Sequence, residues 1–149
     1  MARQVDVGTK PERARRAVAE GELALRPSTR SAIRGRRVPL GDPLGAGELA
    51  GLLAMKRTSE LIPHCHAVRL TSSRVDLAVS ARGVTVLAEA SAVDRTGVEM
   101  EALVGATVAL LTVWDMVKYL EKDARGLYPS TRLGPVRVRT KEKGSVRGR

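Results

Sequence analysis

Cysteine and aromatic residues are scarce in this chain of 149 residues. It has one cysteine, Cys65, with one tryptophan, two tyrosines and no phenylalanine. A single cysteine excludes a disulfide framework within the chain and a zinc site made of four thiolates. So few aromatic rings also argue against the base-stacking sheet surface that many RNA-binding and single-strand-binding modules use.

The sequence also lacks an uninterrupted apolar run of about 18 residues, so we expect no transmembrane helix. Residues 1–10 carry no apolar stretch after their first charges and therefore do not predict a secretory signal. The length favours one domain, residues 1–149, which is large enough to bury a core without a disulfide or a structural metal. We expect flexible tails at 1–4 and 145–149, and a cytoplasmic protein that makes no membrane contact.

Acidic residues are few at the two ends of the chain. The 26 Lys and Arg residues outnumber the 16 Asp and Glu residues, which gives a net charge of +10. Residues 1–40 hold 10 basic and 4 acidic side chains and residues 125–149 hold 8 and 1, whereas residues 41–124 hold 8 and 11. This excess indicates a polyanionic partner, which can be a nucleic acid, an acidic membrane or a phosphorylated small molecule.

The apolar pattern predicts a mixture of strands and helices. Two alternating runs around a turn predict a hairpin, and a wide apolar stripe predicts one long helix whose small residues let a second helix approach closely. The predicted elements are strand 20–26, helix 29–33 capped by Ser28, helix 44–61, strands 66–80 and 84–88, helix 98–121 and strand 136–138. Their order predicts an α+β fold, a two-layer sandwich of an antiparallel sheet with helices on one face.

His64, Cys65 and His66 lie together at the expected start of a strand, where the two histidines would point to the same face. Three interpretations stay open for the histidines: ligands of a metal site that needs further ligands, hydrogen-bonding or acid–base groups, or ordinary structural residues. Nothing nearby predicts a lowered pKa for the Cys65 thiol, so a small buried residue is favoured over a nucleophile.

Two charged pairs in the second half of the chain could carry chemistry. On an extended segment Glu99 and Glu101 would face the same way and could share protons or hold a cationic ring, whereas at a helix start they would complement its dipole. Asp115 and Lys118 are neighbours on one helix face. They predict either a surface ion pair or, beside the apolar stripe, a lysine whose pKa is lowered by desolvation.

Basic residues form two further groups. Arg137, Arg139, Lys141 and Lys143 alternate on the last predicted strand, so they would project from one face. Such a row could bind the phosphates of a small molecule or of a nucleic acid equally well. Lys56-Arg57, near the end of a predicted helix, is read as a solvated surface.

The long helix would keep the Glu99–Glu101 pair apart from the Asp115–Lys118 pair. The stretch from Glu101 to Asp115 spans about 21 Å at about 1.5 Å per residue. A small substrate cannot reach both ends on one chain, so a shared site would need a second subunit. The stripe of small residues on the helix offers a surface for that contact.

Several motifs occur together between residues 5 and 141. They are Val5-Asp6-Val7, Lys56-Arg57-Thr58-Ser59-Glu60-Leu61-Ile62-Pro63 with Cys65-His66, Thr96-Gly97-Val98-Glu99-Met100-Glu101-Ala102-Leu103, Trp114-Asp115-Met116-Val117-Lys118 and Gly134-Pro135-Val136-Arg137. In combination, order and spacing they resemble the MoaC family, the cyclic pyranopterin monophosphate synthases of molybdenum cofactor biosynthesis.

The resemblance implies a ferredoxin-like fold and a homohexamer, a trimer of dimers with active sites between subunits. It implies a lyase that converts 3′,8-cyclo-7,8-dihydro-GTP to cyclic pyranopterin monophosphate and releases pyrophosphate, with no cofactor, metal or nucleic-acid partner. By motif position the catalytic residues would be Asp115 and Lys118, and the substrate-binding residues would be Arg15, Cys65, His66, Glu99, Met100, Glu101 and Lys141, with Lys56 and His64 as further candidates. Among these, the carboxylates would hold the ring and Lys141 would contact phosphate.

The chain departs from the family pattern at four places. His64 is an additional histidine beside Cys65-His66, and the tail from Lys141 to Gly148 replaces a glycine-rich tail of the family. Leu40 stands where the family has the lysine of a Lys-Gly-Asp element, and a leucine can neither transfer a proton nor bind a phosphate. Arg36 or Arg37 could replace the charge, but a guanidinium is a poor base. About six additional residues, 127–132, precede the last strand. An active synthase, a divergent member with weak or lost activity, and a basic nucleic-acid-binding module are therefore the three functional hypotheses.

Overall fold

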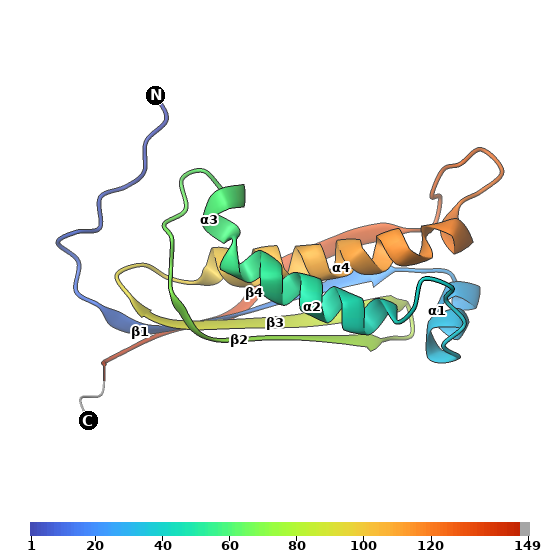
Figure 1. Cartoon of the computed structure of the whole chain (residues 1–149), viewed down its shortest axis with the longest axis horizontal. Helices are drawn as coiled ribbons and strands as arrows, with labels where there is room; N and C mark the ends of the chain where they lie inside the picture. Colours follow the sequence, from blue (N-terminus) through green and yellow to red (C-terminus); the bar gives the residue numbers. More distant parts are fainter. Residues whose placement is uncertain (147–149) are drawn as a thin grey trace.

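The computed structural model describes residues 1–146 and contains a four-stranded sheet with helices against one face (Figure 1). The predicted tail at 145–149 therefore lies largely outside the described residues. In chain order the elements are β1 (Arg13–Ala24), α1 (Pro27–Arg34), α2 (Pro43–Lys56), α3 (Thr58–Leu61), β2 (Leu70–Val79), β3 (Gly83–Asp94), α4 (Glu99–Glu121) and β4 (Arg132–Gly144).

The sheet has the strand order β2-β3-β1-β4, and every neighbouring pair is antiparallel. β1 and β3 pair along their whole lengths, from Arg13 opposite Asp94 to Ala24 opposite Gly83. The expected hairpin is the β2–β3 pair. Alternate residues of β1 and β3 are buried beneath the helices, which gives each strand one apolar and one polar face. The prediction of an α+β two-layer sandwich with an antiparallel sheet is confirmed.

α2 and α4 pack closely because small residues line their contact. A Cβ atom added to Gly51 of α2 would lie 2.8 Å from the Gly105 carbonyl oxygen of α4, so the backbones approach more closely than larger residues allow. Ala102, Ala106 and Ala109 of α4 are fully buried in the same core. The expectation of a close helix contact is confirmed, but the stripe is covered within the chain. The prediction that it serves a second subunit is wrong.

Two predicted boundaries differ in ways that affect the site. The helix expected over 44–61 ends at Lys56, because the backbone leaves the helical conformation at Arg57, with a φ of −114° and a ψ of 14°, and α3 follows as a separate turn. The strand expected from residue 66 begins at Leu70, so His64 and His66 lie on an irregular segment rather than on one strand face.

The start of α1 also differs from the prediction. The helix begins at Pro27, and no side chain caps it, so Ser28 lies inside the helix. Proline is suited to this first position because its fixed φ matches the helix and it has no N–H to satisfy. Gly35 ends the helix as expected.

α4 is the longest helix of the described chain. By length and composition alone it could cross a membrane, although the sequence has no uninterrupted apolar run of that length. Half of its apolar stretch is buried inside the fold, against α2 and the sheet. This is the pattern of the core helix of a two-layer domain.

Candidate active site

The first turn of α4 separates two carboxylates that are two residues apart in the sequence. Glu99 and Glu101 both belong to the helix, where an offset of two residues turns side chains to different faces. Glu99 points to β4, and Glu101 points inward and is only 2% exposed. The extended arrangement with both groups on one face is therefore wrong, and the helix-start position, which suits acidic residues, is correct.

Glu101 is a buried carboxylate with an open bonding position. Its Oε1 lies 3.8 Å from the Sγ of Cys65, and its Oε2 has no hydrogen-bond partner within residues 1–146. Burial raises the pKa of Glu101 above its ordinary value. A buried acceptor without a partner is costly, so Oε2 is suited to accept an N–H or O–H from a bound molecule.

Cys65 is half-buried rather than fully buried as expected, and its thiol does not have the lowered pKa of a nucleophile. Burial raises the pKa of its thiol, and the negative charge of Glu101 raises it further. The thiol therefore stays protonated and can donate to the Glu101 carboxylate. This supports a small polar neighbour of the site rather than a nucleophile.

Glu99 is held by an ion pair across the chain. The Nζ of Lys141 on β4 donates to Oε1 of Glu99 at 2.8 Å. This hydrogen bond from Lys141 holds the pKa of Glu99 below its ordinary value, and the nearby charge of Arg15 acts in the same direction. Glu99 and Glu101 therefore have opposite electrostatic settings within one helical turn.

A β-bulge in β4 places Lys141 beside this helix. Val18 and Ala19 of β1 are consecutive, but they pair with Thr140 and Val138, so Arg139 is an extra residue in β4. Before the bulge, Arg137 pairs with Glu20 on the open face of the sheet. After it, the alternation is reversed, and Lys141 lies on the helix face opposite Ala17. The prediction of one continuous basic row from 137 to 143 is wrong for this reason.

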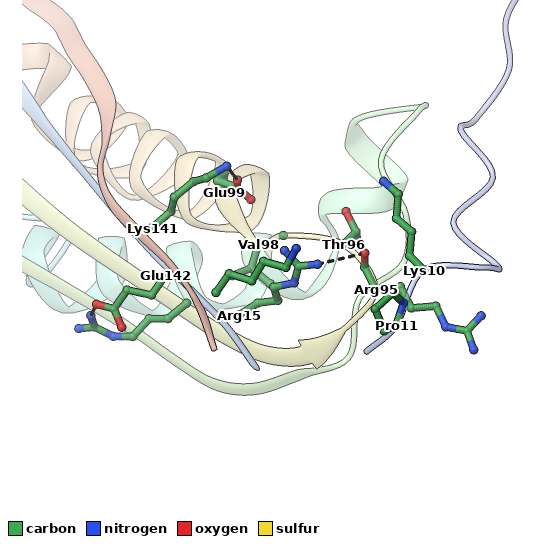
Figure 2. Close-up of a pocket in the computed structure, with 12 residues that line it drawn as sticks. Lys10, Pro11, Arg15, Arg95, Thr96, Val98, Glu99, Lys141 and Glu142 are labelled. Atoms are coloured by element: carbon green, nitrogen blue, oxygen red, sulfur yellow. Dashed lines mark hydrogen bonds and ion pairs between the residues drawn. The ribbon is translucent and has the colours of Figure 1, made fainter. Parts of the chain in front are cut away.

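Basic residues from the strands β1 and β4 and from the adjoining loops surround a hollow of about 560 Å³ at the end of the sheet. Figure 2 shows Arg15 beside Arg95 in this hollow. The Arg15 guanidinium donates to the Arg95 carbonyl oxygen at 3.3 Å and lies 3.5 Å from that of Asp94. This volume is typical of small-molecule sites, and the cations suit phosphate. The cationic lining consists of Lys10, Arg15, Arg16, Arg95, Lys141 and Lys143.

A second hollow of about 450 Å³ adjoins the first. Thr96, Gly97 and Glu99 line both, so one molecule can extend from one hollow into the other. The second hollow is also lined by His64, Cys65, His66 and Met100.

The N-terminal segment contacts His66 and Cys65, two of the residues that line this hollow. The ring nitrogen Nε2 of His66 lies 2.7 Å from the Val5 carbonyl oxygen, and the Gln4 amide donates to the Cys65 carbonyl oxygen at 2.8 Å. Within residues 1–146, no three His, Cys, Asp or Glu side chains are grouped closely enough to hold a metal ion. Both histidines therefore border a polar hollow in this structure.

Asp115 and Lys118 lie far along α4 from both hollows. Lys118 Nζ donates to Oδ1 of Asp115 at 2.7 Å, and the two side chains are 48% and 69% exposed. The hydrogen bond to Asp115 raises the pKa of the Lys118 ammonium, so the predicted lowering by desolvation is wrong for this chain alone. Because α4 is unbroken from Glu101 to Asp115, the separation of about 21 Å expected from the helical rise holds.

Comparison with known proteins agrees with this geometry. The model of the MoaC family matches residues 4–144, nearly the whole chain. The chain belongs to the MoaC family.

Several MoaC relatives cover almost the same length. A protein of Archaeoglobus fulgidus named "Probable cyclic pyranopterin monophosphate synthase" is 49% identical over 95% of this chain and 91% of its own length. A protein of Pyrococcus furiosus with the same name is 44% identical over 95% and 90%. A protein of Methanothermobacter thermautotrophicus named "Probable cyclic pyranopterin monophosphate synthase accessory protein" is 45% identical over 95% and 89%.

The fold brings most of the MoaC motif positions to the paired hollows. The residues gathered there are Arg15, His64, Cys65, His66, Glu99, Met100 and Lys141, with Glu101 behind them. Lys56 lies apart, in a separate hollow beside β2, so it is not brought to this site. Leu40 is 66% exposed on the loop after α1.

Three cations of the first hollow, Lys10, Arg16 and Arg95, were not among the sequence candidates. Arg95 immediately precedes the Thr96-Gly97 motif, and Lys10 lies three positions after the last residue of the Val5-Asp6-Val7 motif. Their closeness to motifs of the MoaC family is the signal that could have identified both. Arg95 also donates to the Gly8 carbonyl oxygen at 2.6 Å, which connects the two segments.

Proposed function

We propose that this MoaC-family protein is a cyclic pyranopterin monophosphate synthase. It is a lyase that converts 3′,8-cyclo-7,8-dihydro-GTP to cyclic pyranopterin monophosphate, with release of pyrophosphate, in molybdenum cofactor biosynthesis. The full-length similarity to relatives that carry this enzyme name supports the activity. A cytoplasmic location suits a chain whose lone cysteine is a free thiol.

The observation that carries the proposal is the pair of adjoining hollows that meet at Glu99. A nucleoside triphosphate derivative has a strongly anionic end and a ring with several N–H donors. The hollow lined by Arg15 and Lys141 suits the phosphates. The adjoining hollow suits the ring, because Glu101 lies behind Cys65 there and its Oε2 would accept a hydrogen bond from a ring that reaches it. His66 and Met100 would border the ring.

The proposed acid–base group is Lys118. The conversion rearranges bonds to carbon, nitrogen and oxygen, so protons must be delivered and removed as it proceeds. Asp115 would orient the ammonium through the 2.7 Å hydrogen bond. Because that bond raises the pKa of Lys118, the residue is protonated before reaction and would act first as an acid.

Cations would assist the departure of pyrophosphate. Arg15, Arg95 and Lys141 lie in one hollow, where fixed positive charge can stabilise the negative charge that develops on the leaving oxygen. Arg15 already has its orientation fixed by two backbone carbonyl oxygens, so it loses little freedom on binding phosphate.

We further propose a homohexamer, a trimer of dimers, with each active site shared between two subunits. The support is geometric: Lys118 is exposed and about 21 Å along α4 from Glu101, farther than a small substrate can reach. In a two-fold dimer, one subunit can place its Lys118 end against the paired hollows of the other.

Pyrophosphate release from the cyclic dihydro-GTP derivative tests the activity directly. Purified protein with this substrate should release pyrophosphate and form the cyclic phosphate product in equal amounts. Folded protein that releases none above background would disprove the synthase assignment. The Leu40→Lys variant belongs in the same assay, because a large gain would show that the missing loop lysine limits the rate.

Co-expression of two inactive variants tests the shared site. Lys118→Ala and Glu101→Gln subunits should each be inactive alone, because each destroys one half of every site. Random dimers of the two should regain about a quarter of the wild-type activity, since one site of each mixed dimer is intact. No recovery, with mixed oligomers present, would place both residues in sites within one chain.

A further inference from the structure

The loop between α4 and β4, residues 122–131, has an ordered structure of its own. The Asp123 side chain accepts hydrogen bonds from the backbone N–H groups of Arg125 and Leu127 at 2.8 and 2.9 Å. Its backbone N–H donates to the Leu127 carbonyl oxygen at 2.9 Å, and Gly126 makes the turn with a φ of 77°. These bonds close residues 123–127 into a compact turn, which fixes the direction of the backbone at Tyr128.

The far end of the loop is fixed to the last turn of α4. The Thr131 hydroxyl donates to Oε2 of Glu121 at 2.5 Å, and Glu121 is fully buried. Oε1 of the same carboxylate accepts from the Thr29 hydroxyl and from the Arg26 backbone N–H. Glu121 therefore joins α4, α1 and the loop. Figure 1 shows that these three segments meet at one end of the molecule.

Tyr128 lies between these two fixed points and packs on α4. Its ring makes an edge-to-face contact with Trp114, with ring centres 5.5 Å apart and planes at 85°. Trp114 and Lys118 are one helical turn apart on the same face of α4. The half-buried Tyr128 ring therefore stands on the side of α4 that carries Lys118, and the phenol adds to the effect of Asp115 in raising the Lys118 pKa.

We propose that Tyr128 is a positioning residue for Lys118. Its ring, fixed by Trp114 and by the loop, forms a wall beside the lysine side chain and restricts the positions that the ammonium can reach. The Lys118 side chain is half exposed and otherwise held by one ion pair with an exposed Asp115. A wall on the open side keeps the ammonium on Asp115, which matters because small displacements of an acid–base group reduce rates strongly.

This inference rests on the proposed role of Lys118, and it gives the loop at 127–132 a function. Residues 127–132 supply both the ring and the Thr131 anchor. The additional segment therefore belongs to the Lys118 end of the molecule.

The test compares Tyr128→Phe and Tyr128→Ala with Tyr119→Ala, the same change at the tyrosine of α4. For Tyr128→Ala we expect kcat to fall about 10-fold with little change in KM, because a positioned group is lost and the hollows are intact. Tyr128→Phe should stay within about 2-fold of wild type, since the ring is retained. Tyr119→Ala should leave kcat unchanged. If Tyr128→Ala does not fold, Tyr128→Leu takes its place.

A second measurement does not depend on activity. The rate at which an amine-acylating reagent modifies Lys118 at pH 8 is measured by peptide mass spectrometry, with Lys122 of the same chain as the internal reference. Tyr128→Ala should increase the ratio of Lys118 to Lys122 modification, and Tyr128→Phe should not.

Two results would overturn the proposal. Equal modification ratios in wild type and Tyr128→Ala would show that the ring does not restrict Lys118, even if activity falls. A Tyr128→Phe variant as impaired as Tyr128→Ala would show that the hydroxyl, not the wall, is required. If wild-type protein releases no pyrophosphate, the synthase assignment fails while the modification ratio still tests the wall.

Discussion

The two ends of α4 present opposite kinds of functional surface. At the first turn, Glu99 and Glu101 meet side chains from β1, β4 and the segment before β2, and Glu101 is almost wholly buried. At the other end, Asp115 and Lys118 lie on the helix surface and bond mainly to each other. The first end is a pocket assembled by the fold, whereas the second is an exposed pair.

This difference indicates that the two ends of α4 have separate roles, one in substrate binding and the other in acid–base chemistry. A buried, preorganised surface suits substrate binding, because its side chains and charges are fixed before the ligand arrives. An exposed ion pair contributes little to stability by itself and is free to act on a molecule held elsewhere. Asp115 and Lys118 acquire a defined environment only when another surface covers them, which is the reason for proposing a shared site.

Lys118→Ala, at the exposed end of α4, should have the largest effect on activity and leave stability unchanged. We expect kcat to fall about 10²- to 10⁴-fold, the usual contribution of a general acid or base, with the urea midpoint unchanged because the side chain is exposed. Pyrophosphate release and urea denaturation measure the two quantities. Lys122→Ala, at the next exposed lysine, is the matched control, and equal losses for both variants would contradict the assignment.

Glu121→Ala tests whether the exposed end depends on a buried anchor. Loss of the carboxylate leaves the Thr29 and Thr131 hydroxyls and the Arg26 N–H without their partner, so the free energy of unfolding should fall by about 3 kcal/mol. Urea denaturation measures this loss. Glu60→Ala, an exposed glutamate of α3, should leave the value almost unchanged. A loss below about 0.5 kcal/mol at position 121 would show that the network is not a structural anchor.

Arg15→Ala tests the binding role of the pocket end. We expect KM to rise about 10- to 100-fold with a smaller effect on kcat, because one charge-assisted contact to phosphate is removed. Steady-state kinetics of pyrophosphate release measure both constants. Arg13→Ala, on the same strand but outside the hollow, is the control. A fall in kcat with KM unchanged would instead assign Arg15 to the chemical step.

Glu101→Gln and Glu99→Gln should change stability in opposite directions. Burial raises the pKa of Glu101, so ionising it costs stability as the pH rises above the ordinary glutamate value. Glu101→Gln should therefore stabilise the fold by about 1 kcal/mol at pH 8, less at pH 5, while activity is lost.

Glu99→Gln should lower the free energy of unfolding, whereas Glu101→Gln should raise it. The bond from Lys141 lowers the pKa of Glu99, so the ionised form stabilises the fold above the ordinary glutamate pKa and this contribution disappears as the pH falls. Glu99→Gln should cost about 0.5 kcal/mol at pH 8 and less in acid. Urea denaturation at two pH values checks both variants. The same sign for both would contradict the two electrostatic settings.

Much of the fold could be predicted from the sequence because its signals are local. The apolar stripe of α4 and the alternation around the turn before Gly83 are periodicities within single elements, and both were found in place. The Asp115–Lys118 pair was predictable for the same reason, since residues one turn apart on a helix are neighbours. The predicted boundaries were wrong at Lys56 and Leu70, where irregular backbone replaces the periodic pattern.

The sequence by itself determined the fold class, the family and several of the charged residues that line the hollows, among them Arg15, Glu99 and Lys141. Only the tertiary structure decided how those residues differ. Arg139 is an extra residue in β4 without a pairing partner in β1, and it turns Lys141 toward Glu99, 42 residues away. The packing of α4 buries Glu101 beside Cys65, 36 residues away. Strand register and burial set these contacts, and both depend on the whole core rather than on the neighbouring residues of the chain.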